Sequence, residues 1–340
     1  MHTPTACVTV SDIGEHALIA RITRGLSMPS WVVAGPGDDA AVVTATRGAL
    51  DALTTDTLGE GVHFDQTLMP PQAIGQRALA VNLSDLAAMG ARPRTALLSL
   101  ALPASLSVAA LDGFVEGFVS HAATEGVTLV GGNVTRTTGP WVIGVTATGV
   151  VNPRGLLRRT GARPGDGVYV TGWLASAAVG LMSLRQPAQD ASGPGPFAEC
   201  EARYQYPVAR VRAGLQLSHH RAASSCMDLS DGLADGVRQL SAASDVGMVI
   251  DADALPLMPA VHRWHAAHGT DAVATALTGG DDYELIFTVR PRHAGRLRGA
   301  ARRCGDLPIT RVGVVTASTD LLVRRGETLA PLSGGYEHFR

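Results

Sequence analysis

Hydrophobic and polar positions follow two different periods along the first half of the chain. Residues 71–89 repeat their apolar positions at helical spacing and stop before Gly90 and Pro93, which predicts a helix followed by a strand over residues 95–102. Ser107 is a suitable N-cap for a second helix with an apolar stripe, which ends at Gly126. Strands are predicted at 40–44 and 50–55, joined as a hairpin, and at 128–130 and 141–150 on either side of a Gly-rich turn.

The second half mixes the same two signals. Strands are predicted at 167–171, 247–250, 284–289, 312–315 and 321–324, and helices at 175–184, 208–217, 233–243 and 291–304. A Pro/Gly/Arg stretch at 152–155 separates the halves, so we expect two domains, residues 1–152 and 153–340. Residues 186–197 contain three Pro and two Gly and are predicted to form a surface loop. The pattern alone therefore predicts an α+β protein with two halves of similar size.

Composition narrows the chemistry, because all 28 basic residues of the Lys+Arg count are arginine. Without lysine there is no P-loop lysine, no Schiff-base lysine and no protein-kinase strand lysine. Any phosphate chemistry must therefore use metal ions, arginine and backbone amides. A formal net charge of −2 also argues against a nucleic-acid-binding protein, since that binding needs a basic face.

Cysteine spacing and hydropathy indicate the compartment. The four cysteines are far apart and form no C-x-x-C pair, which is typical of a reducing compartment. Residues 1–22 lack the pattern of a signal peptide, and no stretch reaches the roughly 18 apolar residues of a membrane span. We expect a soluble, cytoplasmic protein with no membrane partner.

Acidic residues gather in short strings beside glycine and hydroxyl residues. The strings lie at residues 37–39, 54–56, 82–85, 228–231 and 279–284. Carboxylate and hydroxyl oxygens suit hard cations, and like charges that converge need a cation to neutralise them. The strings therefore predict a Mg²⁺ site.

Two of these strings also have a simpler interpretation. Asp231 precedes a predicted helix and is, taken alone, better explained as its N-cap. Asp38 and Asp39 follow Gly-Pro-Gly and suit a turn. Asp85 is different, because it falls inside an apolar helical run, where an unpaired charge is costly and a partner or metal is expected.

Three further features are candidates for phosphate or substrate contact. The pair Gly131-Gly132, with Asn133 and Arg136 after it, either lets backbone amides approach a phosphate or forms a plain hairpin turn. Residues 158–161 offer two arginines to a phosphate, or form a solvated basic linker. His63 alone is more often structural than catalytic. No G-x-G-x-x-G opens a helix after a strand, so a Rossmann dinucleotide site is not supported.

Taken in chain order, the strings strongly resemble the thiamine-monophosphate kinase family. The matching segments are residues 37–42, 54–64, 80–91, 131–136, 159–166, 227–233 and 279–285, and the match runs from residue 14 to residues 335–339. The segment AVNLSDLAAMGA at 80–91 is the most specific of them. Selenophosphate synthetases fit less well because Cys7 lacks a Gly-rich setting, and the hydrogenase-maturation relatives fit less well because the chain ends without a cysteine.

The resemblance implies the fold of aminoimidazole ribonucleotide synthetase, with an N-terminal half whose strands pair across a homodimer into a β-barrel and a C-terminal α/β half. It implies transfer of the γ-phosphoryl group from ATP to thiamine monophosphate with Mg²⁺ and with no covalent protein intermediate. By motif match, the Mg²⁺ ligands would be Asp39, Thr54, Thr55, Asp56, Asp85, Asn133, Asp228 and Asp231. ATP would contact Gly132, Asn133, Arg159 and Ser230, and the substrate would contact His63, Asp281 and Ser333.

Three residues depart from the family pattern. Asn133 stands where the family has Asp, Asp281 where it has Glu, and Ser333 where it has an aromatic that stacks on the substrate. All three concern the metal or the acceptor rather than ATP. Two alternatives therefore stay open, a divergent kinase that phosphorylates another small molecule and a catalytically silent ATP-binding dimer.

Overall fold

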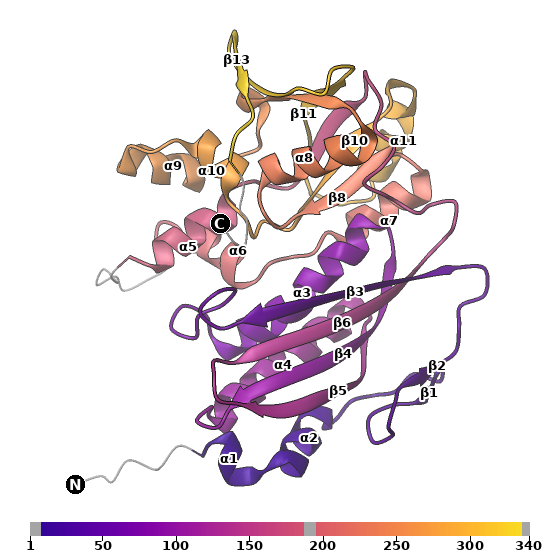
Figure 1. Cartoon of the computed structure of the whole chain (residues 1–340), viewed down its shortest axis with the longest axis vertical. Coiled ribbons are helices and arrows are strands. Elements are labelled where there is room, and N and C mark those ends of the chain that lie inside the picture. Colours follow the sequence, from indigo (N-terminus) through magenta and orange to yellow (C-terminus); the bar gives the residue numbers. More distant parts are fainter. Residues whose placement is uncertain (1–7, 187–194, 335–340) are drawn as a thin grey trace. The chain divides into compact units, whose positions relative to one another are not determined.

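The computed structural model describes residues 8–186 and 195–334 and divides into two compact units (Figure 1). The first unit comprises the chain up to Asn82 together with Pro93–Val150, and the second comprises Leu83–Arg92 and the chain from Val151 onward. Helix α3 (Pro71–Ala88) thus begins in the first unit and ends in the second. The loop predicted at 186–197 falls mostly outside the described residues, as do Cys7 and the C-terminal motif at 335–339.

The first unit is built on a four-stranded sheet in the order β3-β6-β4-β5, in which β4 and β5 run parallel. A two-stranded ribbon, β1-β2, stands apart from it, and α4 packs on the sheet (Figure 1). Besides α3, the elements of this unit are α1 (Val10–Ile13), α2 (Glu15–Thr23), β1 (Val32–Ala34), β2 (Val42–Val43), β3 (Leu50–Gly59), β4 (Arg92–Pro103), α4 (Val108–Glu125), β5 (Thr128–Thr137) and β6 (Val142–Val151).

The two faces of this sheet differ in burial. Along β6 every second residue is buried, as expected for a strand with one covered face. The covered side contains an aromatic cluster in which Trp141 meets Phe64 and Phe114 edge-on, at 5.6 and 5.1 Å between ring centroids. On the other face Leu53 is 71% exposed and Leu97 is 39% exposed. The sheet therefore leaves apolar side chains in solvent on its open face.

Two sequence predictions for this unit are wrong. The segments at 40–44 and 50–55 form no hairpin, because β2 pairs with β1 and β3 pairs with β6. The Gly-rich turn after residue 130 does not exist either, since β5 continues through Gly131, Gly132 and Asn133 beside β4. In both cases, strand pairing with a segment distant in sequence overrides the local preference of these residues for a turn.

The second unit is built on a mixed seven-stranded sheet in the order β13-β12-β9-β11-β7-β10-β8. Helix α8 packs on β8, β9 and β10, and α10 packs on α8. The elements are β7 (Gly167–Thr171), α5 (Ser176–Leu184), α6 (Ala198–Gln205), α7 (Val211–His220), β8 (Ser225–Leu229), α8 (Leu233–Ser244), β9 (Gly247–Asp251), α9 (Pro259–His268), α10 (Ala272–Thr278), β10 (Glu284–Val289), α11 (Ala294–Ala301), β11 (Ile309–Thr316), β12 (Leu321–Arg325) and β13 (Thr328–Pro331), with short 3₁₀ turns at Ala252–Ala254 and Pro291–His293.

The core of this unit is aliphatic, with members such as Val168, Leu233 and Ile250 from strands and helix α8. Strand β10 and the edge strand β8 are buried at every position, so both of their faces are covered. Cys200, Cys226 and Cys304 are buried free thiols. In the described ranges, every helix is too short or too polar to span a bilayer.

Candidate functional site

Four of the predicted site residues meet in one cleft of the first unit. The cleft has a volume of about 900 Å³ and lies among α2, the loop 35–41 and strands β3 to β6. Its walls include Asp39, Thr55, Gly132 and Asn133, together with apolar side chains such as Ile22. A cleft that joins carboxylate, amide and backbone groups to an apolar wall can accept a ligand with a charged end and a flat apolar end.

Gly132 brings the backbone of β5 close to β4 within this cleft. A Cβ at this position would overlap the carbonyl oxygen of Leu98, its register partner on β4. Glycine is therefore required here by packing, whatever ligand the cleft accepts. Asn133 follows it in the strand and is exposed on the cleft wall.

Strand alternation separates the three neighbouring candidates on β3. Thr55 lines the cleft, and its hydroxyl donates to the Val145 carbonyl oxygen at 3.1 Å. Thr54 and Asp56 point to the opposite face, the one that also carries the buried Leu58, because successive side chains of a strand alternate. A single cation in the cleft can thus be reached by Thr55 but not by all three residues of this string.

His63 lies in the turn after β3. Its Nδ1 accepts a hydrogen bond from the Gly59 amide at 3.1 Å, which leaves Nε2 as the protonated nitrogen of a neutral ring. The ring is half-buried and does not line the cleft. The structure therefore gives His63 a local structural bond and leaves its predicted substrate contact as a prediction.

The acidic site of the second unit forms where α3 ends beside β8. Ser84 donates its hydroxyl to the Asp228 carboxylate at 2.8 Å, and both residues are buried. Burial, and to a smaller extent the charge of Asp85, raise the pKa of Asp228 to about 7, although Ser84 and Arg159 act in the opposite direction. Each of these carboxylates disfavours the charged form of the other where burial limits contact with water. A bound cation would offset this repulsion.

The loop after β8 carries the next two candidates. Ser230 donates its hydroxyl to Asp231 at 2.8 Å. Helix α8 begins at Leu233, and its N-cap is Gly232 with no side-chain cap bond, so the interpretation of Asp231 as the helix cap is wrong. Asp231 is instead a half-buried carboxylate two residues from the end of β8.

Arg159 and Arg158 serve different places, although they are neighbours. Arg159 donates a hydrogen bond to Gln239 on α8, and it lies close enough to Asp228 for its charge to lower the pKa of that carboxyl.

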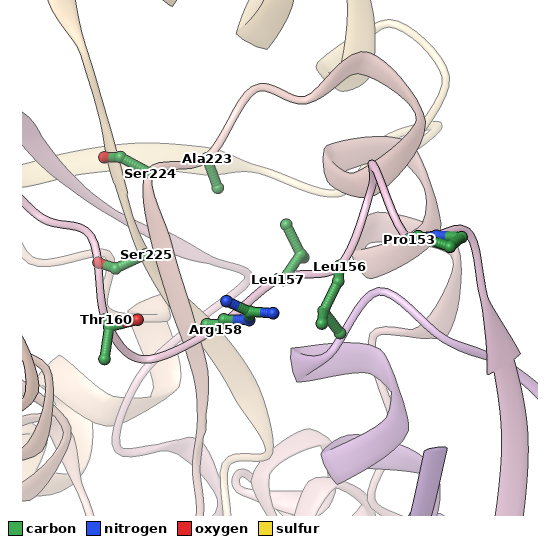
Figure 2. A pocket seen from close by; sticks show the side chains of 8 residues that line it. All are labelled: Pro153, Leu156, Leu157, Arg158, Thr160, Ala223, Ser224 and Ser225. Carbon is green, nitrogen blue, oxygen red and sulfur yellow. The ribbon is translucent and has the colours of Figure 1, made fainter. Parts of the chain in front are cut away.

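The Arg158 side chain lies in a separate pocket of about 300 Å³ (Figure 2). That pocket is lined by Pro153, Leu156, Leu157, Arg158, Thr160, Ala223, Ser224 and Ser225. Ser224 and Ser225 each share a hydrogen bond with Thr288, and Ser224 also donates to Asp166. Arg158 and Thr160 are the other polar side chains in its lining. The two arginines therefore do not form one joint phosphate site.

Residues 279–284 form a strap between α10 and β10 that runs beside the loop after β8. The Asp281 amide donates to the Ser230 carbonyl oxygen at 2.8 Å, so this candidate lies next to the acidic site. Ser333 is exposed after β13, and the adjacent Gly334 approaches Thr278 at the start of the strap. The second unit thus brings Asp85, Arg159, Asp228, Asp231 and Asp281 into one region.

Two residues of this region were not singled out from the sequence. Arg210 and Glu284 form a buried ion pair at the end of the strap. Glu284 was visible only as part of an acidic string, and Arg210 had no local signal, because the two residues are 74 positions apart. Only the fold brings them together.

A metal site is not preassembled from acidic, histidine or cysteine side chains alone. In the described part of the chain, no three such side chains lie close enough to hold one ion. The predicted ligands divide between the units, with Asp39, Thr55 and Asn133 in the first and Asp85, Asp228 and Asp231 in the second. The donor set is nevertheless all oxygen, and the electrostatic coupling of Asp85 with Asp228 fits a hard cation such as Mg²⁺.

The chain is similar over almost its whole length to known kinases. Residues 37–151 match the N-terminal domain, and residues 163–324 the C-terminal domain, of the family described as AIR synthase related protein. Thiamine-monophosphate kinase of Escherichia coli (strain K12) is 37% identical over 329 residues, which cover 96% of this chain and 98% of that enzyme. The chain belongs to the thiamine-monophosphate kinase family. The family and the enzyme class predicted from the motifs, a thiamine-phosphate kinase, are thereby confirmed.

Solved structures of thiamine-monophosphate kinases share this fold. The crystal structure of the enzyme from Stenotrophomonas maltophilia K279a superposes with a TM-score of 0.78 at 36% identity and covers 91% of this chain and 94% of its own. The structure of AaThiL complexed with AMPPCP and TMP gives a TM-score of 0.75 at 29% identity, with 98% and 100% covered. The predicted pair of AIR synthase-like domains is confirmed at this level.

Proposed function

We propose that this chain transfers the γ-phosphoryl group of ATP to thiamine monophosphate, giving thiamine diphosphate and ADP, with Mg²⁺ as cofactor. The observation that carries the proposal is the cleft of the first unit, which joins Asp39, Thr55, Gly132 and Asn133 beside an apolar wall. It is supported by the similarity, over nearly the full length of both chains, to AaThiL, whose structure holds AMPPCP and TMP. The acidic region of the second unit would serve the transferring phosphate.

The reaction needs no covalent intermediate on the protein. An oxygen of the acceptor phosphate attacks the γ-phosphorus, and the bond from that phosphorus to the bridging oxygen of ADP breaks, so that ADP leaves with the electron pair. The acceptor phosphate is already ionised near neutral pH, so no strong general base is required. Arg159 would stabilise negative charge on the phosphates, and the backbone at Gly132 would allow them to approach closely.

The residues present fit Mg²⁺. Asp39, Thr55 and Asn133 would hold an ion in the first unit, and Asp85, Asp228 and Asp231 would hold one in the second, in each case through oxygen atoms. Thr54 and Asp56, on the face of β3 opposite the cleft, stay predicted ligands that do not face it. When bound, Mg²⁺ neutralises the phosphates and stabilises the charge that develops during transfer. Asn133 contributes a neutral oxygen where a carboxylate would bind more strongly.

The open face of the first unit's sheet supports a homodimer. Leu53 projects from it outside the cleft, and the β1-β2 ribbon adds the exposed Val33 and Val42, whereas Leu97 on the same face lines the cleft. Exposed apolar side chains on one sheet face are typical of an interface, and a second copy would cover this one in the barrel expected from the sequence. The cytoplasmic location and the lack of a nucleic-acid partner stay predictions from the sequence.

Another phosphorylated acceptor is the second candidate. It is favoured by Ser333, an exposed side chain that cannot stack on a thiamine ring. It is also favoured by Asp281, whose carboxylate accepts a hydrogen bond from the Tyr283 hydroxyl at 3.1 Å and is thereby partly occupied.

An ADP-release assay tests the proposal. We expect turnover with thiamine monophosphate, and none with thiamine or without acceptor. Asp231→Ala should lower kcat by at least about 10³-fold, because a metal ligand at the transferring phosphate is lost. Its thermal unfolding and circular dichroism should match those of the exposed control Asp306→Ala. Full activity in Asp231→Ala would remove the metal assignment, and ATP binding without turnover on thiamine monophosphate would favour the alternatives.

A further inference from the structure

The ion pair between Arg210 and Glu284 is almost completely buried. Their side chains are 10% and 2% exposed, and both guanidinium contacts reach the two carboxylate oxygens. Burying two charges costs desolvation that their attraction often does not recover, so a buried pair contributes little net stability compared with apolar packing. Such a pair is better explained by its effect on structure, since it fixes the positions of the segments that carry the two residues.

Glu284 joins three separate segments. Besides Arg210, which precedes α7, it accepts hydrogen bonds from the Thr171 hydroxyl at 2.7 Å and from the Trp173 amide at 3.4 Å, just after β7. The Thr171 hydroxyl in turn accepts from the Leu285 amide at 2.8 Å. The adjacent Gly172 leaves room for this carboxylate, because any Cβ there would overlap it and φ is +58°. The first residue of β10 is therefore fixed from several sides.

The strap that ends at Glu284 is backbone-strained. Asp281 and Tyr283 have φ angles of +71° and +49°, in the left-handed region that side chains with a Cβ disfavour. Strain of this kind persists only where the surroundings over-determine the conformation. Here Asp282 also accepts hydrogen bonds from the amides of Ala175 and Ala177 at 2.7 and 3.2 Å, at the start of α5.

The strained strap is bonded to the acidic loop. The Asp281 amide donates to the Ser230 carbonyl oxygen at 2.8 Å, and the Tyr283 amide donates to the Leu229 carbonyl oxygen at 2.9 Å. The Tyr283 hydroxyl donates to Asp281, which sets the direction of that carboxylate. A shift of the strap would therefore move Asp281 away from its place beside the acidic loop.

We propose that Glu284, clamped by Arg210, is a positioning residue that holds Asp281 beside the acidic loop and thereby places the acceptor. This inference rests on the proposed function and on the predicted contact of Asp281 with the acceptor. ATP depends less on the clamp, because Arg159 is held independently by Gln239 on α8. The clamp thus governs acceptor binding more than ATP binding.

Steady-state kinetics of two variants test the clamp. Glu284→Gln keeps the shape but leaves Arg210 charged and unpaired, so it should lower stability and raise the acceptor KM. The double variant Glu284→Gln/Arg210→Gln removes both charges and should recover much of the stability. We expect its acceptor KM to stay raised by about tenfold or more, with the ATP KM within about threefold of wild type. The control Asp251→Asn breaks an exposed ion pair with Arg324 in the same unit and should change neither.

Hydrogen exchange tests the same clamp without activity. In the double variant the amides of Asp281 and Tyr283 should exchange faster than in wild type, whereas Asp251→Asn should leave them unchanged. An acceptor KM that recovers together with stability, or unchanged exchange at both amides, would overturn the inference. A wild-type protein with no turnover on thiamine monophosphate would contradict the proposed function instead, and the exchange experiment would still decide whether the clamp holds the strap.

Discussion

Asp282 holds its carboxylate against the first turn of α5, where it accepts hydrogen bonds from two backbone amides. Desolvation nevertheless raises its pKa from 3.8 to about 7, and the hydrogen bonds from Ala177 and Ala175 only partly oppose this. The folded protein therefore holds the proton more tightly than the unfolded chain does. This contribution to stability is complete below about pH 4 and is lost as the pH rises towards 7.

Replacing Asp282 with Asn should flatten this dependence. The Asn side chain does not ionise and keeps one acceptor oxygen for one of the two amides. The variant should therefore be less stable than wild type at low pH, but its free energy of unfolding should decline less between about pH 4 and pH 7. The difference should be a few kcal/mol at most. Urea unfolding at several pH values measures it, with the exposed Asp306→Asn as control. Equal pH slopes for wild type and Asp282→Asn would contradict the assignment.

Among the elements, β5 shows that glycine does not always indicate a turn. Two adjacent glycines suggested a turn, yet β5 continues through them because the backbone of β4 lies too close for any side chain at Gly132. At Gly131 the nearest atom is the flexible end of Leu97, so a side chain there has room to displace it. Position 131 can therefore accommodate a side chain more easily than position 132.

Gly132→Ala and Gly131→Ala form a matched pair that tests this close approach. Gly132→Ala should lower the free energy of unfolding by about 1–3 kcal/mol, because the new methyl meets the fixed carbonyl oxygen of Leu98. Gly131→Ala should lower it clearly less. Chemical denaturation of both variants checks the difference. Equal losses would mean that β4 and β5 can separate freely at this point.

Periodicity predicted the elements whose burial repeats regularly. Helices α3 and α4 and strands β7 and β10 were found close to their observed bounds, since their apolar positions suffice to specify them. Strand β8 was missed, because a short, fully buried strand that includes Asp228 shows no alternation. Strand β2 was paired with the wrong partner, because the three residues of β1 give no signal of their own.

At the scale of the whole molecule, the sequence indicated candidate site residues but did not show which of them lie close together. The acidic strings made Asp85, Asp228 and Asp231 candidate site residues, because carboxylates beside glycine are unusual in apolar surroundings. Local sequence carried no signal for the Arg210–Glu284 pair, since it depends on three segments that meet only in the fold. The sequence thus indicated which residue types the candidate site uses, whereas the residues that position them became visible only in the fold.

Oligomeric state is the prediction that belongs to this scale. Leu53→Glu places a charge on the open apolar face and should weaken the proposed homodimer by about tenfold or more, since burying an unpaired charge is costly. Leu329→Glu changes another exposed leucine, on β13, and should leave the dimer intact. Sedimentation velocity over a range of concentrations measures both. A wild-type monomer, or equal behaviour of the two variants, would contradict this interface.

The strained strap also bears on how the protein can adapt. Asp281 and Tyr283 hold left-handed backbone angles that glycine would adopt without strain. Glycine at Tyr283 would nevertheless remove a buried side chain, and glycine at Asp281 would remove the carboxylate and give the unfolded chain more freedom. Backbone preference alone therefore does not decide which residues this strap can accept, because the side chains that cause the strain also supply its contacts.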